Sequence, residues 1–266
     1  MYPELFSIGP FTIYSYGLMA AIGFLLCGYL LERELARVGK NKELAGSIII
    51  STIIGGIVGS KIYFLIENPG LLQDDFFGTV FSGAGLVWYG GLIGGFLAVV
   101  WWIRRKGLPF FLVADLVGPL LLMGQAMGRV GCFLSGDGCY GPPADVPWAM
   151  SFPNGVVPTT ELVHPTPLYD VILLMSFFLL LWLLRKKNFK PGTIFGLFGI
   201  FMGTERFFTE FYRTNPKTVL GVFSQAQFIS ILLFCAGLAL IIYVNWIKKY
   251  PGEKSMKTAR KVESEE

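Results

Sequence analysis

Long apolar stretches limit this chain to one class of structure. Seven of them approach the length of about 20 residues that an α-helix needs to cross a bilayer. With 53% hydrophobic and 15% charged residues and a mean hydropathy of +0.59, the chain is too apolar to cover a water-soluble surface. We therefore predict an all-α integral membrane protein with about seven transmembrane helices, near residues 12–32, 45–66, 86–103, 110–127, 167–184, 193–211 and 222–246.

Clusters of lysine and arginine between these stretches predict the orientation of the chain. Cytoplasmic connections of membrane proteins carry an excess of both residues. Here they gather in the first, third and fifth connections and at the start of the tail: Arg33, Arg37, Lys40, Lys42, Arg104, Arg105, Lys106, Arg185, Lys186, Lys187, Lys190, Lys248 and Lys249. The sixth connection, with Arg213 and Lys217, is a mild exception. The pattern predicts an N-terminus outside, a cytoplasmic C-terminus and a multi-pass protein of the bacterial inner membrane.

The remaining segments fit a single polytopic membrane domain over residues 1–251. Two connections on the outer side, near 67–85 and 130–166, are long enough to carry a function. Residues 252–266 are highly charged and are predicted to form a cytoplasmic tail. The N-terminus lacks the basic region and small-residue cleavage site of a signal peptide, so we expect the first apolar stretch to be a helix of the mature protein.

Net charge and cysteine content argue against two kinds of partner. The net charge is +4, but the basic residues lie between apolar stretches as topology signals, so no nucleic-acid partner is expected. The four cysteines, Cys27, Cys132, Cys139 and Cys235, lack zinc-type spacing, and no metal site is expected. Cys132 and Cys139 would face an oxidising compartment, where a disulfide and two free thiols both remain open.

Charged side chains inside apolar stretches are costly, so they line cavities or pair with one another. In the sixth stretch Arg206, Glu210 and Arg213 are spaced i, i+4 and i+7, which places them on one helix face. A structural ladder of ion pairs at a helix end would account for this spacing. A binding site for an anionic lipid headgroup would account for it equally well.

A glycine-dense stretch begins at the end of the fourth predicted helix. Residues 124–141 contain six glycines together with Gln125, Arg129 and Asp137. Glycine lets the backbone approach a ligand closely, and a guanidinium and backbone N–H groups suit a phosphate. The alternative is a tightly packed helix exit. Tyr16 and Tyr89 could likewise be ordinary interfacial tyrosines.

At these residues the chain resembles the prolipoprotein diacylglyceryl transferase family, and the matching motifs occur in order over most of its length. They are Tyr16-Gly17, Gly90-Gly91-Leu92-Ile93-Gly94, Gly128-Arg129-Val130-Gly131 with Gly141, His164-Pro165-Thr166-Pro167-Leu168-Tyr169-Asp170, and the set Arg206, Glu210 and Arg213. The resemblance implies transfer of the diacylglyceryl group of phosphatidylglycerol to the lipobox cysteine of a prolipoprotein. A thioether forms and glycerol phosphate is released. The implied partners are phosphatidylglycerol, prolipoprotein signal peptides and membrane lipids, and no cofactor is implied.

The resemblance also assigns roles to residues. Arg129 and Arg206 would hold the lipid phosphate and offset the charge that develops on it as it leaves. Glu210 would orient Arg206 or the glycerol hydroxyls. The headgroup site would further include Tyr16, Gln125, Asp137 and Gly141.

Tyr89 stands at a catalytic position where the family commonly has histidine. A tyrosine with an ordinary pKa near 10 is a poor base unless an arginine lowers that pKa. Cys132 and Ser135 replace asparagines and Asp137 replaces a glutamate in the family loop. These departures leave open a divergent paralogue with another acceptor. A transporter for a small organic anion is a further alternative, because the same charges could line a pathway.

Overall fold

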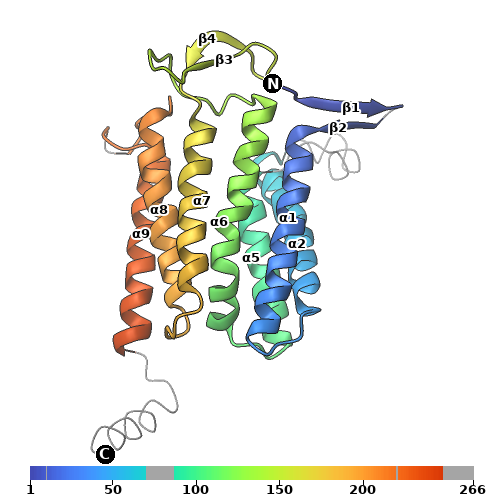
Figure 1. The fold of residues 1–266 in the computed structure, drawn as a ribbon, viewed down its shortest axis with the longest axis vertical. Coiled ribbons are helices and arrows are strands. Elements are labelled where there is room, and N and C mark those ends of the chain that lie inside the picture. Colours follow the sequence, from blue (N-terminus) through green and yellow to red (C-terminus); the bar gives the residue numbers. More distant parts are fainter. Residues whose placement is uncertain (10, 70–86, 220, 248–266) are drawn as a thin grey trace, which may run out of the picture.

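The computed structural model describes residues 1–9, 11–69, 87–219 and 221–247. This part of the chain contains seven long helices, one at each predicted stretch: α1 (Ser15–Arg37), α2 (Leu44–Glu67), α5 (Trp88–Arg105), α6 (Phe110–Ser135), α7 (Thr166–Leu184), α8 (Thr193–Thr209) and α9 (Gln225–Ile242). Successive helices run in opposite directions along one bundle (Figure 1). Five of them, α1, α2, α6, α7 and α9 with its continuation to Ile247, are long and apolar enough to cross a membrane. The chain is therefore a mostly helical, multi-pass membrane protein.

The other two long helices, α5 and α8, fall just short of that standard. α8 has 17 residues, and α5 ends in Arg104 and Arg105, which lower its mean hydropathy. Each packs along an apolar helix, α5 on α2 and α8 on α9. A 3₁₀ turn, η1 (Glu210–Tyr212), follows α8, and a π-helical turn, η2 (Tyr243–Ile247), continues α9.

The largest departure from the predicted helix ends concerns α6. The prediction ended this helix at residue 127, but α6 continues to Ser135. The glycines in this stretch serve helix contact instead of breaking the helix: a Cβ on Gly131 would lie 3.1 Å from the Tyr16 ring of α1. The helix ends where Gly136 takes a left-handed φ of +59°, a conformation that favours glycine. As a result, Arg129 and Cys132 lie on a helix and not in a loop.

Within the described residues, two β-hairpins lie at the end of the bundle where the N-terminus is found, and an all-α prediction does not include them. β1 (Glu4–Ile8) pairs antiparallel with β2 (Phe11–Tyr14) before α1. β3 (Met150–Phe152) pairs antiparallel with β4 (Thr159–Val163) between α6 and α7. Strands this short carry too little alternation to be predicted from sequence.

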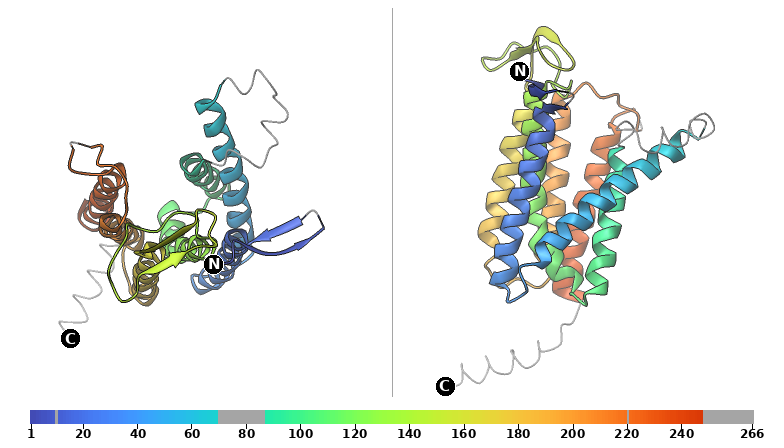
Figure 2. Two further views of the ribbon diagram at one scale, coloured as in Figure 1. Left: turned by 90° about the horizontal axis from the view of Figure 1, so that it is seen from above. Right: turned by 90° about the vertical axis from the view of Figure 1, so that its right-hand side faces the viewer.

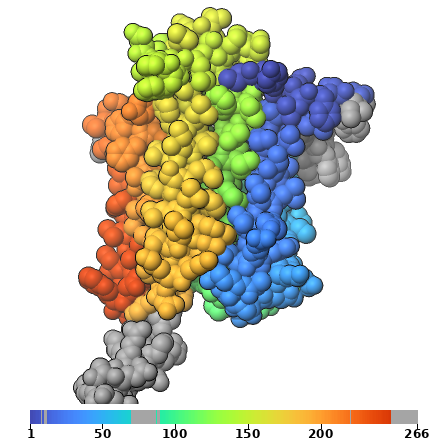
Figure 3. Space-filling model, in the orientation of Figure 1, coloured from blue at the N-terminus to red at the C-terminus, as the bar shows by residue number. Residues whose placement is uncertain are grey.

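Residues 136–165, which we call the α6–α7 cap, lie over the end of the bundle above α6 and α7 (Figure 3). Phe152 of β3 is fully buried, with its ring stacked on Tyr140 at 5.0 Å and edge-on to Phe133 of α6 at 6.0 Å. The backbone N–H of Val157 donates to the carbonyl of Gly136 at 2.9 Å. The cap is thus an ordered structure built onto the end of α6.

α6 is the central helix and packs on α1, α7 and α8. Its Asp115 side chain accepts hydrogen bonds from the backbone N–H groups of Gly192 at 2.7 Å and Phe195 at 2.8 Å. These N–H groups belong to the first turn of α8, where a carboxylate satisfies unpaired donors and complements the helix dipole. This contact fixes the position of α8 along α6, and with it the arginines that the two helices carry.

α2 and α5 pack most extensively on each other, and α2 is inclined to α1 (Figure 2). A Cβ on Gly59 would lie 2.3 Å from the carbonyl oxygen of Gly90, and one on Gly94 would lie 2.2 Å from that of Gly55. Only glycine permits backbones to come this close. Nearly all of the predicted connection near 67–85, and the predicted tail at 252–266, lie outside the described residues.

Candidate functional site

Three arginines and three carboxyl groups gather at the capped end of the bundle. At their centre Asp170 of α7 is fully buried. Its Oδ2 atom lies 3.0 Å from Nε of Arg129 on α6 and 2.6 Å from Nη2 of Arg213, which follows η1. One carboxylate oxygen therefore holds guanidinium groups from two separate parts of the chain.

Arg206, in the last turn of α8, has its own partner. Its Nη2 atom lies 2.9 Å from Oε2 of Glu210, one helical turn further along. The other oxygen of Glu210 accepts hydrogen bonds from Asn215 at 2.8 Å and from the Ser224 hydroxyl at 2.7 Å. Ser224 is also the N-cap of α9, where it forms a capping box with Gln227. The start of α9 thus fixes the carboxylate that orients Arg206.

Several buried polar atoms of this cluster have no hydrogen-bond partner within the described residues. They include both carboxylate oxygens of Glu205, Nη1 of Arg206 and Nε of Arg213. Glu205 is fully buried and lies beside Asp170, within electrostatic range of Arg129 and Arg206. An unpaired buried polar group costs about 1–3 kcal/mol, so such atoms mark a place where a polar ligand gains contacts.

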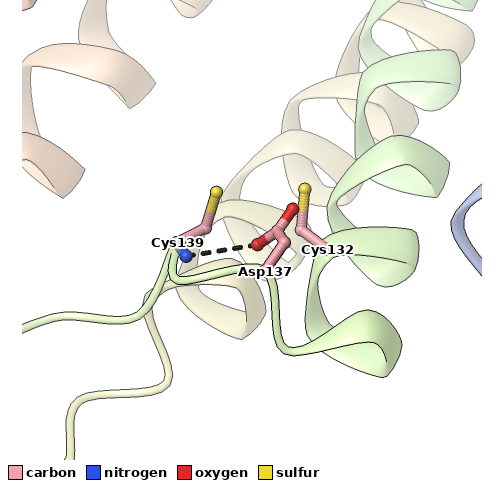
Figure 4. A group of neighbouring side chains, drawn as sticks. All are labelled: Cys132, Asp137 and Cys139. Atoms are coloured by element: carbon pink, nitrogen blue, oxygen red, sulfur yellow. Dashed lines mark hydrogen bonds between the residues drawn. The ribbon is translucent and has the colours of Figure 1, made fainter. Parts of the chain in front are cut away.

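Two cysteines and an aspartate lie close together beside the arginine cluster. Cys132 at the end of α6 and Asp137 and Cys139 of the cap have their Sγ, carboxylate oxygen and Sγ atoms within 4.8 Å of one another (Figure 4). The Cys139 backbone N–H donates to Asp137 at 3.2 Å, and Nη1 of Arg129 lies 3.9 Å from the Cys139 sulfur. A hydrogen bond from the Cys132 thiol, aided by Arg129, lowers the pKa of Cys139 to about 7. Both thiols are free.

The cap is tied to α7 and to η1 by a polar and aromatic cluster around the only histidine of the chain. His164 Nδ1 lies 3.0 Å from the Tyr169 hydroxyl, which also accepts a hydrogen bond from Trp148 at 2.7 Å. The His164 ring is 5.3 Å from the Tyr212 ring. Thr166 donates a hydrogen bond to the carbonyl of Cys139. These contacts hold the end of the cap over the arginine cluster.

The structure brings most of the predicted site residues to this end. Gln125 is half-buried one helical turn before Arg129 on α6, and Tyr16 lies at the start of α1, 49% exposed, against Gly131. Gly141 allows close backbone contact: its N–H donates to the His164 carbonyl at 2.9 Å, and a Cβ there would lie 2.2 Å from the carbonyl oxygen of Tyr212.

Tyr89 lies in the first turn of α5, and its side chain is outside the described part of the structure. Asp137 lies in the cap beside the arginine cluster, and its carboxylate groups with the sulfur atoms of Cys132 and Cys139.

Two carboxyl groups at the heart of the cluster were not assigned a role from the sequence. Asp170 is part of one of the matching motifs, and Glu205 precedes Arg206 in the sequence. The signal was present, because an acidic residue within an apolar stretch needs a partner or a function. Sequence spacing on one helix could not show that Asp170 meets Arg129, since the two belong to different helices.

Comparison with known proteins identifies the family. The family model for prolipoprotein diacylglyceryl transferase matches residues 3–243, which include every residue of the site. The chain belongs to the prolipoprotein diacylglyceryl transferase family. The resemblance carried by the sequence motifs is thereby confirmed.

Relatives within this diacylglyceryl transferase family cover nearly the whole chain. The protein of Clostridium tetani is 36% identical over 248 residues, 90% of this chain and 96% of the relative. Those of Vibrio parahaemolyticus and Vibrio vulnificus are 34% and 37% identical over 267 and 252 residues, covering 96% and 91% of this chain and 95% and 90% of the relatives. All three are named phosphatidylglycerol–prolipoprotein diacylglyceryl transferase.

Proposed function

We propose that this chain transfers the diacylglyceryl group of phosphatidylglycerol to the lipobox cysteine of prolipoproteins. Family membership and the names of the relatives support this reaction, and they do not favour a transporter of small organic anions. The supporting observation within the site is that Arg129 and Arg206 lie within electrostatic range of each other. The two residues come from different helices, and Nη1 of Arg206 is buried without a partner among the described residues.

The reaction needs what this cluster provides. The acceptor thiol gives up its proton to solvent, and its sulfur attacks the glyceryl carbon that carries the phosphate. A carbon–sulfur bond forms, the carbon–oxygen bond breaks, and the electron pair leaves with glycerol phosphate. Negative charge grows on the phosphate oxygen in this step, and positioned guanidinium groups stabilise it most in a site sheltered from water. Arg129 and Arg206 hold the phosphate, while Glu210 and Asp170 keep the two guanidinium groups in place.

The membrane topology is part of the proposal. All seven helices cross the bacterial inner membrane, with the N-terminus and the α6–α7 cap outside. The connections that follow α1, α5 and α7 lie at the opposite end of the bundle and carry the basic clusters, which favours a cytoplasmic position for that end. The residues from 1 to 251 act as one membrane domain, and 252–266 extend into the cytoplasm. Phosphatidylglycerol and the signal peptide then reach the site from the outer half of the bilayer.

A transfer assay with purified protein tests this assignment. Radiolabelled phosphatidylglycerol and a lipobox peptide are incubated with the wild type, with Arg206→Ala and with Arg104→Ala. Loss of one preorganised donor to a developing oxyanion typically costs about 100-fold to 1,000-fold in rate, and we expect Arg206→Ala to lose about this much. Arg104 is exposed at the far end of α5, so Arg104→Ala serves as the matched control with unchanged transfer. Equal rates for both variants would contradict the role of Arg206.

A further inference from the structure

The cluster of Cys132, Asp137 and Cys139 has the composition of a metal site, although sequence spacing argued against one. The ligands come from the last turn of α6 and from the first residues of the cap, which the left-handed turn at Gly136 folds back toward the helix (Figure 4). We propose that these three side chains bind a zinc ion, and that its open fourth position takes the thiolate of the acceptor cysteine. This inference rests on the proposed function and deepens it.

The geometry needs little change to accept the ion. With zinc–sulfur bonds of about 2.3 Å in a tetrahedron, two sulfur ligands lie about 3.7 Å apart. The three ligand atoms here already lie within 4.8 Å of one another. Small side-chain movements, of about one ångström, would bring the ligand atoms to these separations. Two thiolates and a carboxylate are ligands that zinc prefers, and three protein ligands with one open position are typical of a catalytic zinc.

Neighbouring contacts hold the ligands in place. The Cys139 backbone N–H orients the carboxylate of Asp137, and Thr166 of α7 holds the carbonyl of Cys139. Cys132 is buried on α6, three residues after Arg129. Such outer contacts orient metal ligands and are part of the design of metal sites.

Charge balance also favours the ion. Two thiolates and a carboxylate carry three negative charges, so the loaded site has a net charge of minus one. Arg129, with Nη1 3.9 Å from the Cys139 sulfur, compensates this charge while its Nε contacts Asp170. One guanidinium therefore lies between the metal site and the proposed phosphate site. That is the arrangement needed to bring a sulfur nucleophile and a phosphate leaving group to the same carbon.

Zinc would deprotonate the acceptor thiol without a protein base. Binding to zinc displaces the proton of the acceptor thiol to solvent, because the metal ligand is the thiolate. The bound thiolate then attacks the glyceryl carbon, and the electron pair of the broken carbon–oxygen bond leaves on glycerol phosphate. No protein base is required at the moment of attack, so the replacement of the family's histidine by Tyr89 is compatible with the reaction.

Metal content tests the proposal without any transfer reaction. The full chain is purified in detergent under reducing conditions, incubated with Zn²⁺, separated from free metal and analysed by elemental mass spectrometry. We expect one zinc ion per wild-type chain and loss of it in Cys132→Ser, Asp137→Ala and Cys139→Ser. Cys235→Ser is the matched control and keeps the ion, because Cys235 is exposed on α9, outside the cluster. Zinc content in the wild type no higher than in the Cys139→Ser variant would overturn the proposal.

Cobalt tests the open position. Co²⁺ in place of zinc gives a near-ultraviolet band for each thiolate bound to it, and its visible spectrum reports tetrahedral geometry. Adding a lipobox peptide should strengthen the thiolate band, whereas the same peptide with its cysteine changed to serine should leave the spectrum unchanged. No response to the cysteine peptide would overturn the assignment of the fourth position.

The two proposals fail in different ways. Full transfer activity in protein stripped of metal by a chelator would overturn the zinc proposal and leave the transferase function intact. Bound zinc with a peptide-responsive cobalt spectrum, but no transfer from phosphatidylglycerol, would contradict the function and leave the metal site intact. A disulfide between Cys132 and Cys139 in protein isolated from the membrane, shown by thiols that label only after reduction, would also overturn the zinc site.

Discussion

At the scale of single residues, the shared carboxylate of Asp170 dominates the site. Two arginines from different parts of the chain lie on one oxygen of this fully buried side chain. A buried ion pair adds little stability by itself, but removal of one partner leaves uncompensated charge behind. Asp170 thus has two roles, because it keeps Arg129 and Arg213 in place and makes their burial tolerable.

Asp170→Asn should therefore be among the most damaging conservative changes in the chain. Breaking a buried pair costs about 3–5 kcal/mol, and we expect the lower end, near 3 kcal/mol, because Arg129 keeps partial exposure. Thermal unfolding of the purified protein in detergent measures the loss. Asp145→Asn in the cap is the control, since Asp145 is exposed. An unfolding temperature equal to that of the control would show that Asp170 does not carry this role.

The arginines of the site could be predicted from sequence and their carboxylate partners could not. Arg206 lies in the last turn of α8 and Glu210 begins the 3₁₀ turn that continues it, so their spacing predicted their ion pair. The prediction of one helix face for all three residues was wrong for Arg213, which follows the 3₁₀ turn in extended backbone and pairs with Asp170. Arg129 and Asp170 belong to different helices, and the spacing of residues on one helix carries no information about contact between two. The sulfur cluster was missed for the same reason: Cys132 lies on α6, while Asp137 and Cys139 lie in the cap.

At the scale of elements, hydropathy predicted every long helix and placed most helix ends within about three residues, with the C-terminal end of α6 as the largest departure. The α6 helix continues eight residues beyond its predicted end at 127 and includes Gly128 and Gly131. In water glycine weakens a helix, but in a membrane protein it allows helices to approach closely. Composition alone could not distinguish these two uses.

The α2–α5 contact tests this use of glycine. Leucine at position 59 would bring its Cβ to 2.3 Å from the Gly90 carbonyl oxygen, whereas Gly46 of the same helix has open space around it. We expect Gly59→Leu to destabilise the protein by at least the roughly 1–3 kcal/mol typical of overpacking, and Gly46→Leu to have little effect. Thermal unfolding in detergent compares the two variants. If they unfold at the same temperature, α2 and α5 do not depend on close backbone contact.

At the scale of the whole molecule, the capped end carries the site and the opposite end carries the basic clusters. The cap joins the end of α6 to the start of α7 (Figure 1), and the arginine cluster and the two cysteines lie at this end. Such an arrangement suits a reaction at the outer surface of the membrane, with its lipid substrate held at headgroup depth.

Labelling in intact cells tests this orientation. A cysteine introduced as Asn154→Cys lies exposed in the cap, and one introduced as Lys42→Cys lies exposed between α1 and α2. In cells whose inner membrane is intact, a maleimide that cannot cross that membrane should label the cysteine at position 154. It should label the cysteine at position 42 only after the cells are lysed. Reversed labelling would place the site on the cytoplasmic side and contradict the proposed topology.

The central claim is tested most directly by the mass of the peptide product. Purified wild-type protein is incubated with phosphatidylglycerol of defined acyl chains and a lipobox peptide, and the peptide is analysed by mass spectrometry. We expect the peptide to gain one diacylglyceryl group on its cysteine sulfur, with an equal amount of glycerol phosphate released. A folded protein that leaves the peptide unmodified, while a relative from the same family modifies it in parallel, would contradict the proposed function.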